Sequence, residues 1–232
     1  MRIKLLILVT LPLAGFNNSF SQTVEHNGWI FWSHQQKITE KWQFSSDIQV
    51  RTANLPGYIN TVLIRPGIGY NVAKNQTLTV GYTYLGTWEK ENDQMVYEPE
   101  NRIFEQYQVE NKIQNITVSN RIRFEQRFFH QPNDRFFAQR FRYNIQAQFP
   151  LIANQEFTKG MYAAFQNELF LNIQGKSKIN NHVFDQNRTY IGLGYRLNKK
   201  LDLEADYMFR YLVDKDVNVR NNVLQIAIKS SF

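Results

Sequence analysis

The sequence predicts an all-β protein: an antiparallel up-and-down transmembrane β-barrel of the Gram-negative outer membrane, preceded by a cleaved signal peptide. Three observations lead to this prediction. Apolar and polar residues alternate with a period of two, in segments about as long as a tilted membrane-spanning strand. The chain starts with a signal-like segment and ends on an alternating segment that stops at an aromatic residue. We expect a signal peptide at residues 1–21 and one barrel domain at residues 22–232.

The signal peptide is predicted from charge, hydropathy and small residues. Arg2 and Lys4 form a short basic start, and residues 5–16 are mostly apolar. Ser19 and Ser21 then give the small-x-small pattern of a cleavage site, which places cleavage before residue 22. The apolar run holds only about a dozen residues, whereas a membrane-spanning helix needs about 20. An anchor helix is therefore the weaker interpretation.

Composition favours a barrel in lipid over a disulfide-rich or helical protein. The chain has no cysteine, which excludes disulfides and a lipid anchor on an N-terminal cysteine. Aromatic residues make up 15% of the chain, yet the mean hydropathy is −0.48, as expected when only every second strand residue meets lipid. The formal charge is +7, or +5 without Arg2 and Lys4. The basic residues alternate with apolar ones and form no run. We therefore expect most of them to line the interior face of the barrel among acidic residues, and we expect no nucleic-acid partner.

Alternation is clearest at residues 201–213. The odd positions are apolar or aromatic, whereas the even positions include Asp202, Glu204, Asp206 and Arg210. A helical period of 3.6 would mix the two sets on every face, so this segment is predicted as a strand. The same test predicts the other strands, with looser alternation in the first and in 102–113. In chain order they are residues 29–36, 42–51, 62–70, 78–88, 102–113, 121–128, 137–149, 165–173, 188–197 and 224–232.

The predicted connections alternate between short and long, as in outer-membrane barrels. The short turns, which would face the periplasm, are residues 38–41, 72–76, 114–116 and 198–200. The longer loops, which would face outward, are residues 52–59, 89–101, 174–186 and 214–221. Two connections fit less well, because residues 130–134 are short for an outer loop and 151–160 are long for an inner turn.

The strand count conflicts with a general rule. The segments number about eleven, yet bacterial single-chain barrels have an even number of strands. We therefore expect ten or twelve strands. The miscount is placed within residues 24–36, where Asn27-Gly28 is a hairpin-turn signal in its own right.

The apolar face carries two further signs of an outer-membrane location. Leu224, Ile226, Ile228 and the terminal Phe232 share one face, which resembles the signal read by the barrel assembly machinery, although Ser230 departs from the pattern. Aromatic rings also gather at strand ends, where they suit the headgroup layer. These are Trp42, Tyr70, Phe149, Tyr195 and Phe232 at the periplasmic ends, and Trp88, Phe128 and Tyr211 at the outer ends. The expected partners are outer-membrane lipid and, during biogenesis, the assembly machinery; the sequence names no ligand for the outer loops. A soluble barrel with an aromatic core is the alternative.

The most distinctive polar feature is the run Arg121-x-Arg123-x-Glu125-x-Arg127, whose side chains all point to one side of a strand. That side is the lumen if the intervening apolar residues face lipid. Narrow barrels are filled by side chains, and buried charges are tolerated when paired, so a structural network is the favoured interpretation. An anion-selective ring or a phosphate-binding wall is the functional alternative. The predicted lumenal network comprises Arg102, Arg121, Arg123, Glu125, Arg127, Arg140, Arg142, Glu168, Glu204 and Arg210.

Catalytic and metal sites have little support in the sequence. Ser33 and His34 are adjacent, but neighbours on a strand point to opposite faces and cannot act as a pair. Asp202, Glu204 and Asp206 align on one face, but alternate residues lie about 7 Å apart, which is wide for shared ligation of calcium. We therefore predict neither an enzyme nor a cofactor or metal site.

Several of these segments resemble a known family. Glu100-Asn101-Arg102 with Gln106, residues 121–127 and Arg140-Phe141-Arg142 are similar to the family catalogued as domain of unknown function 2490. Trp29 and residues 41–51 are similar too, so the resemblance covers about residues 28–232. The family is a group of predicted outer-membrane proteins, frequent in Bacteroidetes. The resemblance implies fold and location, and it offers no catalytic residues.

Three function classes remain open. The first is a structural or binding barrel with a mostly occluded, charge-filled lumen. The alternative is a narrow passive pore for small, anionic solutes, and an outer-membrane lipid-modifying enzyme is less favoured. Planar-bilayer conductance distinguishes the first two, since only a pore gives discrete current steps.

Overall fold

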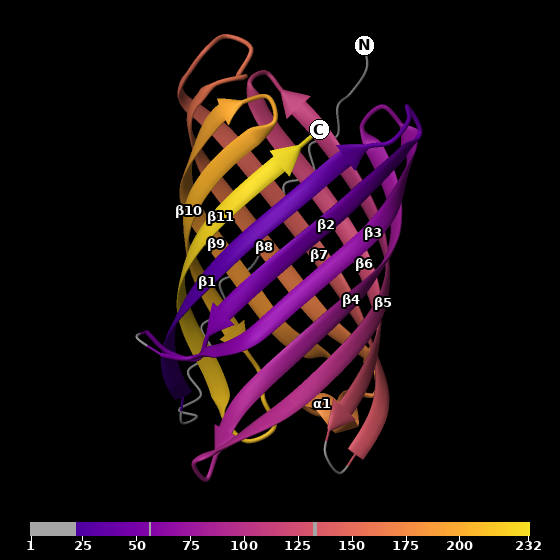
Figure 1. Cartoon of the computed structure of the whole chain (residues 1–232), viewed down its shortest axis with the longest axis vertical. Coiled ribbons are helices and arrows are strands. Elements are labelled where there is room, and N and C mark those ends of the chain that lie inside the picture. Colours follow the sequence, from indigo (N-terminus) through magenta and orange to yellow (C-terminus); the bar gives the residue numbers. More distant parts are fainter. Residues whose placement is uncertain (1–21, 56, 132–133) are drawn as a thin grey trace, which may run out of the picture.

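The alternating segments are strands, and they close into one barrel whose strands tilt strongly to its axis (Figure 1). The structure, a computed structural model, describes residues 22–55, 57–131 and 134–232, and the predicted signal peptide lies outside them. The strands are β1 (Gln22–Lys37), β2 (Trp42–Thr52), β3 (Ile59–Ala73), β4 (Gln76–Glu91), β5 (Gln94–Ile113), β6 (Ile116–Gln131), β7 (Asp134–Ala153), β8 (Gly160–Gln174), β9 (Phe184–Asn198), β10 (Leu201–Leu212) and β11 (Asn218–Ser231). The all-β barrel prediction is confirmed.

The expected even number of strands is wrong, because the described residues form eleven. Residues 22–37 make one uninterrupted strand, β1, and Asn27-Gly28 is not a turn. The Asn27 side chain instead donates hydrogen bonds of 2.9 and 2.8 Å to the carbonyl oxygens of Thr52 and Ala53, at the end of β2. Asn27, which suggests a hairpin turn in the sequence, therefore stabilises the connection that follows β2.

An odd number of strands dictates how the barrel closes. Each strand reverses direction relative to the one before it, so β1 and β11 run the same way. They pair in parallel, from Gln22 opposite Asn218 to Gln35 opposite Ser231, whereas every other pair of described strands is antiparallel. The up-and-down order is thus confirmed, and the expectation of purely antiparallel pairing is corrected at this closing pair.

The connections sort into two ends of the barrel. One end, the short-turn end, carries Phe232 and the connections that follow β1, β3, β5, β7 and β9. The other, the loop end, carries the start of β1 and the short helix α1 (Lys176–Ile179). The predicted long loop at residues 89–101 is wrong, because β4 and β5 continue through it and leave only a two-residue turn at Asn92 and Asp93. No helix in the described part of the chain is long and apolar enough to cross a membrane.

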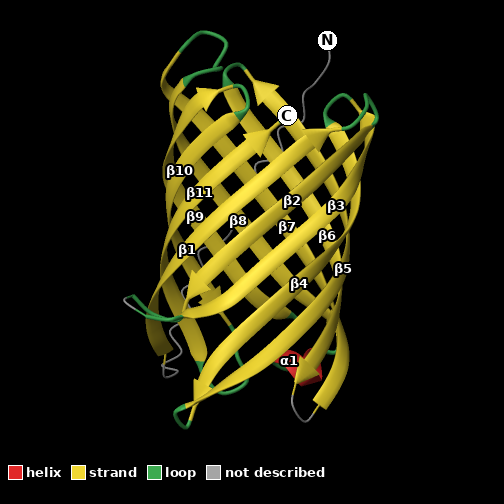
Figure 2. Ribbon diagram, in the orientation of Figure 1, coloured by secondary structure: helices red, strands yellow, loops and turns green. Residues whose placement is uncertain are grey.

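Strands form the wall of the barrel, and loops and turns lie at its two ends (Figure 2). Along the strands, alternation sends charged side chains inward and apolar ones outward. On β10, Asp206 and Met208 are buried, whereas Tyr207 is 50% exposed. On β6, Glu125 is fully buried, whereas Ile122 is 44% exposed. This arrangement is the reverse of a water-soluble core, in which large apolar side chains are inside.

Two glycines make room for large rings inside the barrel. A Cβ added at Gly81 would lie 2.3 Å from the Phe104 ring and 2.5 Å from the Pro66 carbonyl oxygen. A Cβ added at Gly194 would lie 2.2 Å from the Tyr162 ring. These positions let aromatic rings from neighbouring strands fill the lumen beside the charged groups.

Candidate functional site

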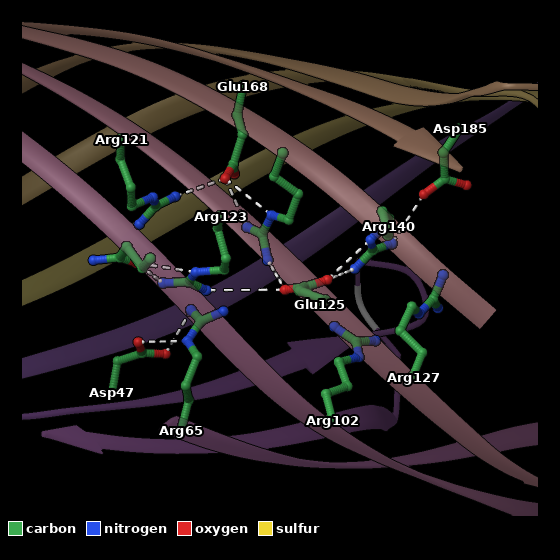
Figure 3. A network of polar contacts seen from close by, with 12 residues as sticks. Asp47, Arg65, Arg102, Arg121, Arg123, Glu125, Arg127, Arg140, Glu168 and Asp185 are labelled. Carbon is green, nitrogen blue, oxygen red and sulfur yellow. Dashed lines mark hydrogen bonds and ion pairs between the residues drawn. The ribbon is translucent and has the colours of Figure 1, made fainter. Parts of the chain in front are cut away.

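A network of arginines and carboxylates crosses the lumen (Figure 3). Its centre is β6, whose alternate residues from Arg121 to Arg127 point inward. The register of β6 with β7 then places Arg140 opposite Glu125, and Arg142 opposite Arg123. The sequence of β6 therefore fixes the face, and the pairing of the strands fixes the partners.

Glu125 is the hub of this network and is fully buried. Arg140 Nη2 lies 2.7 Å from Glu125 Oε2, and Arg142 Nη1 lies 2.6 Å from Oε1. Arg123 Nη1 lies 4.0 Å from Oε1, at the limit of an ion pair. Arg123 is instead bonded through Nη2 to Gln106 Oε1 at 2.5 Å. Two guanidinium groups therefore neutralise Glu125 closely, and Arg123 contributes at longer range.

The network extends from this hub in both directions. Arg142 also binds Glu168 at 2.7 Å, and Arg121 binds the same carboxylate at 2.6 Å. On the other side, Arg140 Nη1 binds Asp185 at 2.9 Å. The chain of ion pairs thus ties together β6, β7, β8 and β9. Buried charges are tolerated in this way, because each has an opposite partner and hydrogen bonds.

Two further groups of charges adjoin the central chain. Glu100 accepts hydrogen bonds from both Arg102 and Arg127, at 2.6 and 2.7 Å. Arg65 binds Asp47 through two hydrogen bonds, from Nε to Oδ2 and from Nη2 to Oδ1, each 2.8 Å long. Glu100 contributes to the family resemblance, but the sequence analysis does not assign Glu100, Asp47, Arg65 or Asp185 to the lumenal network. The inward parity of Asp47 and Arg65 was available, but the predicted loop at residues 89–101 hid Glu100.

Glu204 and Arg210 lie outside the central chain, although the sequence grouped them with it. Glu204 binds Lys229 at 2.6 Å and accepts a hydrogen bond from the Tyr162 hydroxyl at 3.0 Å. Arg210 donates to Gln186 Oε1 at 2.8 Å and has no carboxylate within ion-pair distance among the described residues. The ten residues predicted as one network are therefore divided among several groups.

Aromatic rings support guanidinium groups inside the barrel. Phe170 is fully buried, and the Cζ atoms of Arg140, Arg142 and Arg188 lie 5.1, 4.4 and 4.7 Å from its ring centroid. Arg123 lies 4.5 Å from the Phe104 ring. The negative face of an aromatic ring attracts cations, most strongly where water is excluded. Sequence reasoning missed these rings, because it associated phenylalanine with the lipid face.

A cavity opens from the short-turn end down to the network. This cavity, which we term the vestibule, has a volume of about 490 Å³. Its lining includes Lys199 and Lys200 in the turn after β9, and Arg123 and Arg142 from the network. Ten basic and five acidic residues line it, so its wall carries an excess of positive charge. The vestibule therefore favours anions electrostatically.

A serine–histidine contact lies on the seam between β1 and β11, at the short-turn end. His34 Nδ1 lies 2.9 Å from Ser230 Oγ, a partner that only the parallel closure of β1 on β11 brings near. The Ser230 hydroxyl donates to the Ser33 carbonyl oxygen at 3.1 Å, so its proton is not directed at the histidine. Within the described ranges, no three acidic, histidine or cysteine side chains form a group that could hold a metal ion.

Comparisons with known proteins show the family to which the chain belongs. Residues 26–221 match the family model described as "Protein of unknown function (DUF2490)". An uncharacterized protein of Methylorubrum extorquens is 26% identical over 166 residues, which are 71% of this chain and 69% of the relative. The family match includes every residue of the central ion-pair chain.

Proposed function

We infer a function from the structure of the barrel, because this chain belongs to DUF2490, a family of proteins of unknown function, as the resemblance of its arginine-rich strands indicated. Family membership supplies no activity, so the proposal is built on the barrel itself. The protein is an outer-membrane β-barrel with a charge-filled lumen, and its role is structural or binding rather than enzymatic. Its partners are outer-membrane lipid and, during biogenesis, the barrel assembly machinery.

The observation that carries the proposal is the reversed distribution of side chains. At mid-strand, Ile191 is 66% exposed on the outside, while Glu125 is fully buried inside. Water-soluble monomers rarely expose a large contiguous apolar surface. Lipid solvates such a surface, and a closed barrel leaves no backbone edge unpaired in the bilayer.

Aromatic pairs on the outer surface support the same placement. Trp42 and Tyr70 lie 5.0 Å apart near the short-turn end. Trp88 and Tyr97 lie 4.9 Å apart toward the loop end, as do Phe128 and Phe137 at 5.2 Å. Two bands of rings fit the two headgroup layers of a bilayer.

The end of the chain fits a role in assembly. Phe232 is 53% exposed on the outer surface at the short-turn end. Its backbone N–H donates to the Gln35 carbonyl oxygen at 2.8 Å, and its own carbonyl oxygen accepts from Lys37 at 2.6 Å. The terminal aromatic is thus available to the assembly machinery while the backbone completes the closing seam. The short-turn end then faces the periplasm.

A passive pore for small anions is the second candidate, and the vestibule is the observation that favours it. Its excess of basic residues would attract anions from the periplasmic side. The ion-pair chain across β6 to β9 favours the occluded barrel, because these side chains meet one another inside the lumen.

Membrane fractionation with a matched pair of variants tests the proposal. We expect the native protein in the outer-membrane fraction, extracted only by detergent, and migrating faster on gels before boiling than after it. Ile191→Lys should lower the amount of folded protein, since a lysine facing mid-bilayer lipid costs about 2–4 kcal/mol. Val183→Lys is the control, because Val183 is also exposed but lies in the connection before β9.

Two outcomes would overturn the proposal. The first is a protein that stays in solution without detergent as a compact monomer. The second is equal folding of the two lysine variants, because an exposed lysine is neutral on a surface that faces water.

A further inference from the structure

Three arginines in the lumen have no carboxylate within ion-pair distance among the residues that the structure describes. They are Arg51 on β2, Arg188 on β9 and Arg210 on β10, near the loop end of their strands. We term them the Trp29 cluster, because the closure of the barrel gathers them beside that ring. They differ from Arg121, Arg140 and Arg142 of the ion-pair chain, which bind carboxylates at 2.6, 2.7 and 2.6 Å.

The cluster is held by the Trp29 ring and by two amides, one of which is Gln49, whose Oε1 accepts hydrogen bonds from Arg51 Nε and Nη2 at 3.2 and 2.6 Å. Arg51 is opposite Trp29 in the β1–β2 register, and its Cζ atom lies 4.0 Å from the Trp29 ring centroid. The Cζ atom of Arg188 lies 5.2 Å from the same centroid. Arg188 and Arg210 are opposite one another in the β9–β10 register, and both donate to Gln186 Oε1, at 3.1 and 2.8 Å.

This arrangement leaves several guanidinium donors in the lumen without acceptors. Only the Nε atoms of Arg188 and Arg210 donate hydrogen bonds to described residues, so their terminal nitrogens are free there. Arg188 is only 8% exposed, but its unpaired terminal nitrogens keep some solvent-accessible surface. They therefore border on open space. Like charges directly opposite one another on a sheet are unfavourable, and more so away from water.

The nearby carboxylates are engaged elsewhere. Asp185 binds Arg140 at 2.9 Å, and Glu25 accepts a hydrogen bond from the Asn221 amide at 2.6 Å. Arg188 also lines the vestibule, at the position on β9 farthest from its mouth. A soluble anion that enters the vestibule can therefore reach Arg188, the member of the cluster that lines it.

We propose that the Trp29 cluster binds a multivalent oxyanion of the phosphate class, such as pyrophosphate or a phosphate monoester. Guanidinium forks bind phosphate oxygens in pairs, and three of them call for more than one negative charge. Trp29 and Phe170 hold the guanidinium planes in place before the anion arrives. The inference deepens the binding role proposed above and rests on it.

Calorimetric titration of the folded, full-length protein in detergent with inorganic pyrophosphate tests the site. We expect saturable binding at one site per chain, with chloride a poor competitor. Arg51→Gln, Arg188→Gln and Arg210→Gln should each weaken binding about tenfold or more. Arg220→Gln is the matched control: it makes the same charge change near the same end, but Arg220 is exposed on the outward face of β11, and its binding should equal that of the native protein.

The heat-dependent gel shift shows which variants are folded. Binding by any one of the three cluster variants that is folded is sufficient to test the site. The inference is overturned if the folded native protein shows no saturable binding. It is also overturned if folded cluster variants bind like the native protein, or if Arg220→Gln weakens binding as much as they do. Membrane fractionation determines the location of the protein independently of pyrophosphate binding. A protein in the outer membrane that does not bind pyrophosphate would therefore contradict this site and leave the proposed location intact.

Discussion

Glu125 shows how single residues determine the stability of the lumen. Arg140 and Arg142 bind it closely, whereas Arg123 lies at 4.0 Å and bonds mainly to Gln106. Arg140 also binds Asp185, so its removal weakens the neutralisation of two buried carboxylates at once. Breaking a buried ion pair on one side is costly, because it leaves a charge uncompensated.

We therefore predict that Arg140→Ala lowers the free energy of unfolding by about 3–5 kcal/mol. Arg123→Ala should lower it by less, because Glu125 keeps both close partners. The measurement is the urea midpoint of the heat-dependent gel shift in detergent or vesicles. Equal losses in the two variants would contradict the hub role of Glu125.

At the scale of elements, the closing pair is the least expected feature. The parallel register places Ile30 beside Ile226, both exposed on the outer face, whereas Ala205 lies one strand farther round, beside Ile226. Adjacent strands are about 4.8 Å apart, within the Cα separation of a disulfide, and a strand farther is about 10 Å. The absence of cysteine makes this geometry directly testable.

We predict that the double variant Ile30→Cys with Ile226→Cys forms a disulfide on mild oxidation of the folded protein. The control pair, Ile30→Cys with Ala205→Cys, should not. Peptide mass spectrometry without reduction detects the link. A link in the control pair alone, or in neither folded variant, would mean that β1 and β11 do not close the barrel in this register.

At the scale of the whole molecule, the vestibule opens at the short-turn end and ion pairs cross the lumen farther in. The vestibule reaches Arg123 and Arg142 from the short-turn end, and the chain from Arg121 to Asp185 joins four strands across the barrel. We therefore expect the ion pairs to obstruct passage of solutes through the lumen.

We predict that the native protein gives no discrete conductance steps in planar bilayers. Replacing Glu125, Arg140, Arg142 and Asp185 together by serine should create such steps, because it removes two arginines with two of their carboxylates and leaves Glu168 paired with Arg121. Anion-selective steps from the native protein would favour the pore instead. In that case Arg123→Glu should abolish or reverse the selectivity.

The sequence alone determined the faces of the strands and the barrel class. Alternation is a local property, since successive side chains on a strand point to opposite sides. For this reason Asp206 and Tyr207, or Glu125 and Phe124, are assigned to opposite walls without knowledge of the fold. The inward position of the β6 arginines follows in the same way.

Only the tertiary structure decided the strand number, the closing pair and the partners of each charge. Asn27-Gly28 is a turn signal in isolation, but pairing with β11 from Gln22 to Gln35 keeps this part of β1 extended. Arg51, Arg188 and Arg210 are far apart in sequence and meet because β1 closes the barrel beside β11. Register and closure depend on long-range pairing, and a pattern that repeats every two residues contains no information about which strand comes next to which.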